Sequence, residues 1–266
     1  MAILEKEPGL LEALKGEIVP KFLATRNPEG IPNVVPCVSI LPADDQPDTL
    51  FFGNFLLRKS IRNLEADKRV AILVITPQLN GWILKADFIE FQRTGAYVER
   101  QMSGSLLRYN AYTGIRNAGV IHVTALIRSF HISKMEVALE YGLAKLRSFS
   151  RPKILQDPQP IILPLPVRHE FARMVAVKVL SWIEEDGYPL ISPALSLQPA
   201  GKHAIVGWLG NKPSPPDGAQ VATNILTFEA ISYQAKGSWR KMGHAGEISV
   251  REVFAGGPPY PGGRVA

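Results

Sequence analysis

The chain repeats part of itself, and this repeat limits its possible folds more than any other feature of the sequence. When the 266-residue sequence is displaced by 157 positions, segment 21–43 aligns without a gap with segment 178–200. Eight of the 23 paired positions are identical, whereas chance would give roughly one or two. We therefore expect two copies of one structural unit in the same chain.

The repeated unit is typical of a β-hairpin. In each copy an apolar run ends in a polar turn that closes on glycine, Gly30 or Gly187, and a second apolar run follows. Turn residues that tolerate positive φ between strand-forming runs are typical of hairpins. Prolines inside the second run indicate an edge, a bulge or a bend. A chance coincidence of two unrelated hairpins is the alternative.

Apolar periodicity predicts many short strands and few helices. Helices are expected at 8–15, 58–67 and 133–148, the last with an apolar stripe of Met135, Leu139, Leu143 and Leu146. Strands are expected at 19–26, 33–41, 49–53, 70–75, 85–94 and 121–127, and again at 173–182, 190–197, 203–208, 221–228, 231–238 and 246–253. The pattern favours a mainly β fold with short helices (α+β), built as two small barrels side by side.

Composition along the chain predicts four parts. Residues 1–150 form the first lobe, which includes the long helix, and residues 167–254 form the second lobe. The segment 151–166 between them carries five prolines in 16 residues, which is typical of a stiff linker. The end of the chain, 255–266, contains four glycines and three prolines, and we expect it to be flexible.

Charge and residue content exclude several classes of function. The 30 basic and 24 acidic residues give a net charge of +6, which is compatible with nucleic acid, an anionic membrane or a small anionic ligand. The basic residues are dispersed, so we expect no nucleic-acid partner. The absence of a signal peptide and of a long apolar run predicts a cytoplasmic protein without a membrane partner. One cysteine and five histidines without ligand spacing predict no metal site.

The segment 53–64 carries the strongest indication of a ligand. Arg58 and Lys59 stand at the start of an expected helix, where cations oppose the helix dipole. An anion would compensate for this, and a helix N-terminus with free N–H groups suits phosphate. On charge alone, a solvated basic turn is the alternative.

The stretch from 21 to 94 resembles the flavin-binding split barrel of the pyridoxamine-5′-phosphate-oxidase-like family. The resemblance rests on segments 36–39, 50–54, 58–60, 63–64 and 70–75. It implies two split β-barrel lobes related by internal duplication, with FMN as the cofactor. It also implies that Arg58, Lys59 and Ser60 hold the phosphate. The residues implied to flank the flavin ring are Pro36, Cys37, Val38, Ser39, Phe52, Gly53 and Asn54.

The resemblance implies an FMN-binding oxidoreductase that uses a small-molecule substrate and an electron donor or acceptor. The two lobes would pack as a pseudo-dimer within one chain, and a homodimer is also compatible. An arginine-containing substrate motif of the true oxidases is missing at the C-terminus, so the substrate stays open. In the second lobe, loop 210–218 has three prolines and one lysine, so we expect no phosphate there. The alternatives are a non-catalytic flavin carrier or interaction module, and a protein that uses deazaflavin or haem.

Overall fold

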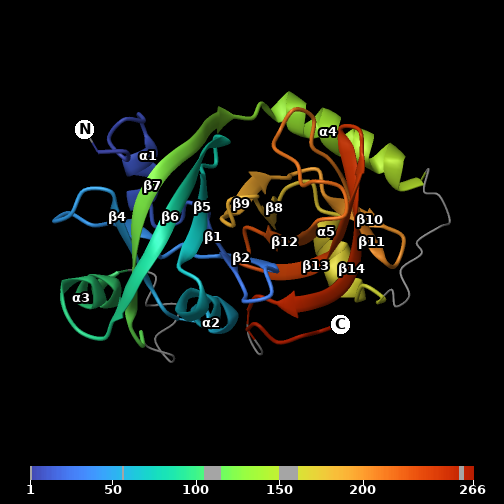
Figure 1. Ribbon diagram of the computed structural model, residues 1–266. Helices are drawn as coiled ribbons and strands as arrows, with labels where there is room; N and C mark the ends of the chain where they lie inside the picture. Colours follow the sequence, from blue (N-terminus) through green and yellow to red (C-terminus); the bar gives the residue numbers. More distant parts are fainter. Residues whose placement is uncertain (1, 56, 105–114, 150–160, 258–260) are drawn as a thin grey trace.

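The computed structural model describes residues 2–55, 57–104, 115–149, 161–257 and 261–266, and shows two β-rich lobes side by side (Figure 1). The helices are α1 (Leu10–Lys15), α2 (Arg58–Ala66), α3 (Ala96–Ser103), α4 (Lys134–Phe149) and α5 (Leu165–Phe171). The first-lobe strands are β1 (Lys21–Arg26), β2 (Pro32–Pro36), β3 (Leu41–Pro42), β4 (Thr49–Gly53), β5 (Arg69–Ile75), β6 (Asn80–Gln92) and β7 (Ala118–His131). The second-lobe strands are β8 (Val177–Ile183), β9 (Pro189–Pro193), β10 (Gln198–Ala200), β11 (Ala204–Trp208), β12 (Gln220–Leu226), β13 (Ser232–Met242) and β14 (Ala245–Ala255).

Both lobes have the same strand order. The first sheet runs β2-β1-β5-β6-β7-β4-β3, and the second, taken from its other end, runs β9-β8-β12-β13-β14-β11-β10. All pairings are antiparallel, and the register Phe22↔Pro36 in the first hairpin recurs as Val179↔Pro193 in the second. The expected mainly β, two-lobe fold is therefore confirmed, and the shared order supports the repeat found in the sequence.

One repeated serine shows how closely the two copies match. The Ser39 hydroxyl accepts a hydrogen bond from the Gly53 N–H and donates one to the Gly53 carbonyl, at 3.2 and 3.3 Å. The Ser196 hydroxyl does the same with Trp208, at 2.9 and 2.7 Å. Each serine ties the loop after the hairpin to the end of the fourth strand of its lobe. These bonds satisfy buried backbone groups that no strand partner reaches.

The lobes meet through a shared apolar core. Phe22, Val34 and Leu73 of the first lobe lie fully buried in one cluster with Val179 and Ile191 of the second. Apolar side chains on this face of the β1–β5 sheet thus find their cover in the other lobe rather than in a helix. Burial at about 25 cal/mol per Å² makes such a contact a main source of stability. The lobes therefore form one body with a continuous interface.

Helix α4 departs from the expected arrangement in two ways. It follows β7 of the first lobe but packs on β10 and β11 of the second lobe, at the upper right of Figure 1. Its expected apolar stripe does not face the core, because Glu140 and Ala144 are the buried residues of the helix. The helix is amphipathic, as the sequence predicts, but ion pairs with Lys212 rather than apolar contacts orient it.

The end of the chain also differs from expectation. Instead of extending as a flexible tail, it folds back along β14, where Val265 N–H donates to the Val253 carbonyl at 2.8 Å. Arg264 forms an ion pair with Glu252 at 3.3 Å, and Gly262 supplies the positive φ of the turn. The proline-rich linker lies mostly outside the described residues, but its last part is packed, with Leu163 buried against the second lobe. Within the described ranges, no helix has both the length and the apolar character needed to cross a bilayer.

Candidate functional site

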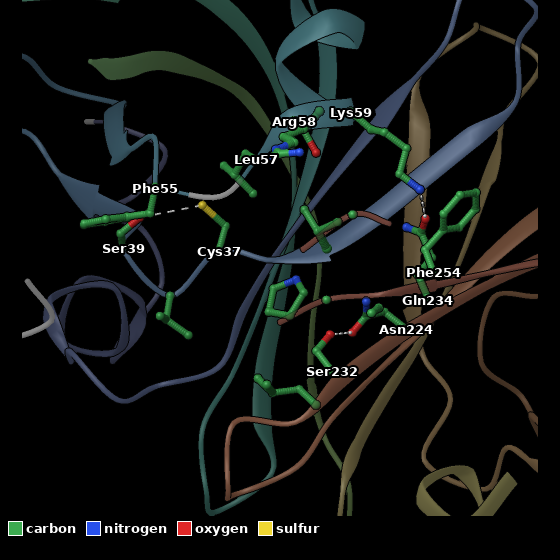
Figure 2. A pocket seen from close by; sticks show the side chains of 18 of the residues that line it. Cys37, Ser39, Phe55, Leu57, Arg58, Lys59, Asn224, Ser232, Gln234 and Phe254 are labelled. Atoms are coloured by element: carbon green, nitrogen blue, oxygen red, sulfur yellow. Dashed lines mark hydrogen bonds between the residues drawn. The ribbon is translucent and has the colours of Figure 1, made fainter. Parts of the chain in front are cut away.

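A cavity of about 260 Å³ lies between the two lobes (Figure 2). Its floor on the first-lobe side is formed by the end of β2 and the residues that follow it. The segment between β4 and α2 closes one side, and β12, β13 and β14 of the second lobe form the opposite wall. The site thus exists only because the two lobes are joined.

Eight of the ten residues expected to bind the cofactor line this cavity. They are Pro36, Cys37, Val38, Ser39, Gly53, Arg58, Lys59 and Ser60. The structure does not bring Phe52 and Asn54 to the cavity. Phe52 is fully buried in the first-lobe core, where its ring packs edge-on against Phe91. Alternation along β4 explains this, because neighbours of Gly53 on the strand point to the opposite face.

The sulfur and hydroxyl groups on the cavity floor have structural roles. The Ser39 hydroxyl is engaged by the Gly53 backbone, and Cys37 Sγ lies 3.8 Å from it. Burial raises the pKa of the Cys37 thiol to about 12, so the thiol stays protonated at neutral pH. Cys37 is therefore a small apolar lining group and not a nucleophile.

The start of α2 faces the cavity without a capping side chain. Leu57 precedes the helix and offers no side-chain hydrogen bond, and the first turn contains no acidic residue. Ser60 is buried there, and Asn33 Nδ2 donates to its hydroxyl at 3.1 Å. Asn33 Oδ1 has no partner among the described residues. The free N–H groups of the first turn and the Ser60 hydroxyl can donate hydrogen bonds to an anion, whereas the unpaired Asn33 oxygen is an acceptor and does not contribute to such a site.

Lys59 crosses the cavity and contacts the other lobe. Its Nζ lies 2.8 Å from the centre of the Phe254 ring and 3.4 Å from Gln234 Oε1 (Figure 2). Burial, together with the neighbouring charge of Lys236, lowers the pKa of Lys59 to about 7. Arg58, by contrast, is exposed at the rim. Lys59 is therefore a desolvated cation beside an uncapped helix end, without a carboxylate partner in the described part of the chain.

The second-lobe wall was not anticipated from the sequence. Gln234 Nε2 donates to the Val34 carbonyl at 2.6 Å, and Asn224 Nδ2 donates to the same oxygen at 3.4 Å. Ser232 in turn donates to Asn224 Oδ1 at 3.1 Å. Only the strand registers of the structure match Gln234 with Ile83 of the first lobe. A polar residue in place of its apolar counterpart marks the wall of the site.

The corresponding position in the second lobe is nearly closed. Its remaining cavity measures about 60 Å³ and is lined by Phe130, Pro193 and Lys212, among others. Lys212, the one lysine of the proline-rich loop, forms ion pairs with Glu136 at 2.7 Å and with Glu140. Its charge is thus already balanced by α4. The absence of a phosphate site in the second lobe stays a prediction.

The residues around the open cavity fit the parts of FMN. A phosphate needs cations and N–H donors, which Arg58, Lys59 and the start of α2 provide. A flavin ring needs an apolar slot, which Pro36 and Val38 provide. A Cβ on Gly53 would lie 2.7 Å from the Phe55 ring, so glycine is needed for this segment to fold closely. Among the described residues, no cluster of metal-ligating side chains is found.

Comparison with known proteins gives limited results. No protein-family model and no curated protein sequence matches the chain. An FMN-binding protein from Syntrophomonas wolfei is 14% identical over 50% of this chain and 88% of its own, with a TM-score of 0.40. An F420 reductase is 24% identical over 43% of this chain and 94% of its own, with a TM-score of 0.35. A putative pyridoxamine 5′-phosphate oxidase from Lactobacillus delbrueckii is 20% identical over 47% of this chain and 92% of its own, with a TM-score of 0.34.

Proposed function

We propose that the protein binds FMN in the cavity between its lobes and acts as a flavin-dependent oxidoreductase on a small molecule. The observation that carries this proposal is Lys59, a desolvated cation beside the uncapped start of α2. Arg58, Lys59 and Ser60 would hold the phosphate, and the segment 36–39 would lie against the flavin ring. Separate groups of residues would thus contact the phosphate and the ring of FMN.

The protein's own part in the chemistry would be positioning and exclusion of water. The ionisable side chains among the described lining residues are Cys37, Arg58 and Lys59, so no carboxylate or imidazole is available as a general acid or base. Flavin supplies the two-electron redox chemistry when it is bound. Gln234 and Asn224 hold the lobes together at the site through the Val34 carbonyl.

The phosphate contact can be tested by titrating flavin fluorescence with FMN and with riboflavin. A charge-assisted hydrogen bond is worth about 1.5–3 kcal/mol. Lys59→Ala should therefore raise the dissociation constant of FMN roughly tenfold to a hundredfold and leave that of riboflavin nearly unchanged. Lys212→Ala is the matched control, because Lys212 is the lysine of the closed site and should leave both affinities unchanged. Equal FMN affinity in wild type and Lys59→Ala would contradict the phosphate role.

A non-catalytic flavin carrier is the second candidate, and the absence of a carboxylate or imidazole among the described lining residues favours it. The visible spectrum of the purified protein separates flavin from deazaflavin and haem. Anaerobic mixing with NADH or NADPH then separates enzyme from carrier. Rapid bleaching of the flavin absorbance, followed by reoxidation with an added acceptor, supports the enzyme. A flavin that only dithionite reduces supports the carrier.

A further inference from the structure

Polar contacts on one side of helix α4 fix its orientation. Its two acidic residues, Glu136 and Glu140, both pair with Lys212 of the second lobe; the Glu140 side chain is buried, whereas that of Glu136 is 42% exposed. The inner side is fixed further by Tyr141, whose hydroxyl donates to the Ala172 carbonyl at 2.6 Å and whose own carbonyl accepts from Gln198. The helix is therefore held in one orientation by these contacts with the second lobe.

The opposite side of the helix is apolar and exposed. Met135, Leu139, Leu146 and Phe149 have exposed fractions of 81, 63, 67 and 76%. With Gly142, where no atom lies within 4 Å of the Cβ position, they follow the helical repeat along one face. Figure 1 shows this helix on the outside of the second lobe, and none of the labelled helices and strands lies over its outer side. A contiguous apolar stripe of this kind on a surface marks an interaction site.

Two exposed cations flank the stripe. They are Lys134 and Lys145, and Lys145 Nζ stands 5.6 Å from the centre of the Phe149 ring. Neither lysine forms an ion pair with a described residue. Because Lys212 balances both acidic residues of α4, the outer surface of the helix combines apolar groups with these unbalanced cations. Its complement must be apolar and anionic.

We propose that α4 docks the protein on the surface of an anionic lipid bilayer, with the stripe at the level of the headgroups and the two lysines among the lipid phosphates. Amphipathic helices with apolar and lysine-bearing sides lie in the interface in this way. A second copy of the chain is a poorer occupant, because its α4 would bring the same lysines against these. The stripe is also convex, which suits a deformable surface better than a rigid one.

This proposal revises one expectation from the sequence. The absence of a long apolar run excludes a spanning segment, but it does not bear on a helix that lies on a membrane. The periodicity at 133–148 is visible in the sequence, but it does not say which side of the helix is buried. Only the inward position of Glu140 shows that the apolar stripe points outward.

Flotation with lipid vesicles tests the proposal. The full chain should float with vesicles of phosphatidylcholine and phosphatidylglycerol in equal amounts, and not with vesicles of phosphatidylcholine alone. Leu139→Ser/Leu146→Ser and Lys134→Glu/Lys145→Glu should each lower the partition coefficient about tenfold or more. High salt should weaken binding of the wild type. These side chains are exposed, so thermal melts should match the wild type.

The matched control removes two exposed apolar side chains elsewhere. Ile18 and Phe228 are 85 and 73% exposed and lie outside α4. Ile18→Ser/Phe228→Ser should float like the wild type, and an equal loss in this variant would overturn the proposal. Equal flotation with neutral vesicles, or none with either kind, would also overturn it. A dimer in light scattering that Leu139→Ser/Leu146→Ser dissociates, without vesicle binding, would assign the stripe to a second copy instead.

Discussion

The two lobes offer the same kind of site twice, and only one of the two is open. In the open site, the ends of β13 and β14 present Gln234, Phe254 and Gly256 to the cavity. Strand registers place Ile83, Arg128 and Phe130 at the matching positions of β6 and β7, around the closed site. The cavities measure about 260 and 60 Å³. Two copies of one fold thus differ mainly in the bulk and charge of a few side chains.

Two features close the second site. The Phe130 ring lies so close over Gly81 that a Cβ on this glycine would be 2.2 Å from the ring. In the open site, Ser232 takes the position of Gly81 and Gly256 takes the position of Phe130. The glycine of the pair is therefore on the opposite strand. In addition, α4 balances the charge of Lys212, whereas Lys59 has no carboxylate partner in the described ranges. The Phe130 ring and the two carboxylates that pair with Lys212 therefore close the second site.

The largest expected effect comes from transferring the closed arrangement to the open site. Ser232→Gly/Gly256→Phe copies the pair Gly81 and Phe130 and would place a ring across the cavity. A phenyl ring cannot share this volume with a flavin ring, so FMN and riboflavin affinity should both fall at least about a hundredfold. Fluorescence titration measures both ligands.

The single variant Ser232→Gly is the control for this exchange. It removes the hydrogen bond to Asn224 but adds no bulk, so it should retain most of the flavin affinity. Thermal melts without ligand show whether the double variant is folded. If the folded double variant binds FMN as tightly as the wild type, the ring of Phe130 is not what closes the second site.

A second comparison concerns the repeated lysines Lys21 and Lys178, which are both fully buried. Lys21 Nζ donates to the carbonyls of Gly16 and Val38 at 2.7 and 3.2 Å. Lys178 Nζ has no hydrogen-bond partner among the described residues. Lys21→Met should therefore lower the free energy of unfolding by about 1–3 kcal/mol, because it leaves two carbonyls unpaired. Lys178→Met should raise it by about 1–3 kcal/mol.

Urea denaturation at two pH values checks this pair. Burial lowers the pKa of Lys178 to about 7 from an unfolded value of 10.5. Between these values the unfolded chain binds more protons, so the stability contributed at this position rises with pH. The stability gain from Lys178→Met should accordingly shrink between about pH 7 and pH 10. A destabilised Lys178→Met at pH 7 would show that the contact of Lys178 Nζ with the Tyr141 ring, 5.5 Å from its centre, outweighs the cost of burying the ammonium group.

Sequence reasoning predicted the fold and named the residues on one side of the candidate cavity. Strands, hairpins and the start of α2 are local or repeated features, and the repeat alone predicted that the sheets match. The opposite wall could not be found in this way, because Gln234 meets Val34 across 200 positions of the chain. The outward face of α4 was missed for a related reason. Periodicity shows that a helix has two sides, but the pairing of Glu140 with Lys212 decides which side is buried.

A smaller effect is expected from pH on the open site. The pKa of Lys59 is lowered to about 7, mainly by burial and then by Lys236, while Glu252 opposes the shift. Lys59 must be protonated to bind phosphate, so FMN affinity should fall up to about tenfold between pH 7 and pH 9. Over this range the phosphate is already dianionic, so its own titration does not mask the loss.

Riboflavin and the variant Lys59→Arg serve as controls for the pH series. Riboflavin lacks the phosphate and should bind equally at both pH values. Arginine keeps its charge throughout, so FMN affinity of Lys59→Arg should stay level. A flat profile for the wild type would mean that Lys59 does not bind the phosphate as a titrating cation.

The smallest expected difference lies between the two hairpin turns that first revealed the repeat. Gly30 and Gly187 both have positive φ, 76° and 82°, so alanine should cost about 1 kcal/mol of unfolding free energy at either position. Gly187 carries an additional cost, because its turn contacts the other lobe. Arg26 Nη1 donates to its carbonyl at 3.0 Å, and a Cβ there would lie 2.1 Å from Arg69 Nη1.

Gly187→Ala should therefore be less stable than Gly30→Ala by roughly 0.5 kcal/mol, the cost of moving a partly exposed arginine away from the interface. Around Gly30, the nearest atom to a new Cβ is Arg26 Nη2 at 3.7 Å, which is ordinary contact. Urea denaturation of both variants measures the difference. In an Arg69→Ala background the extra cost at Gly187 should disappear, since no guanidinium has to move. If the difference persists there, backbone strain rather than the contact between lobes distinguishes the two turns.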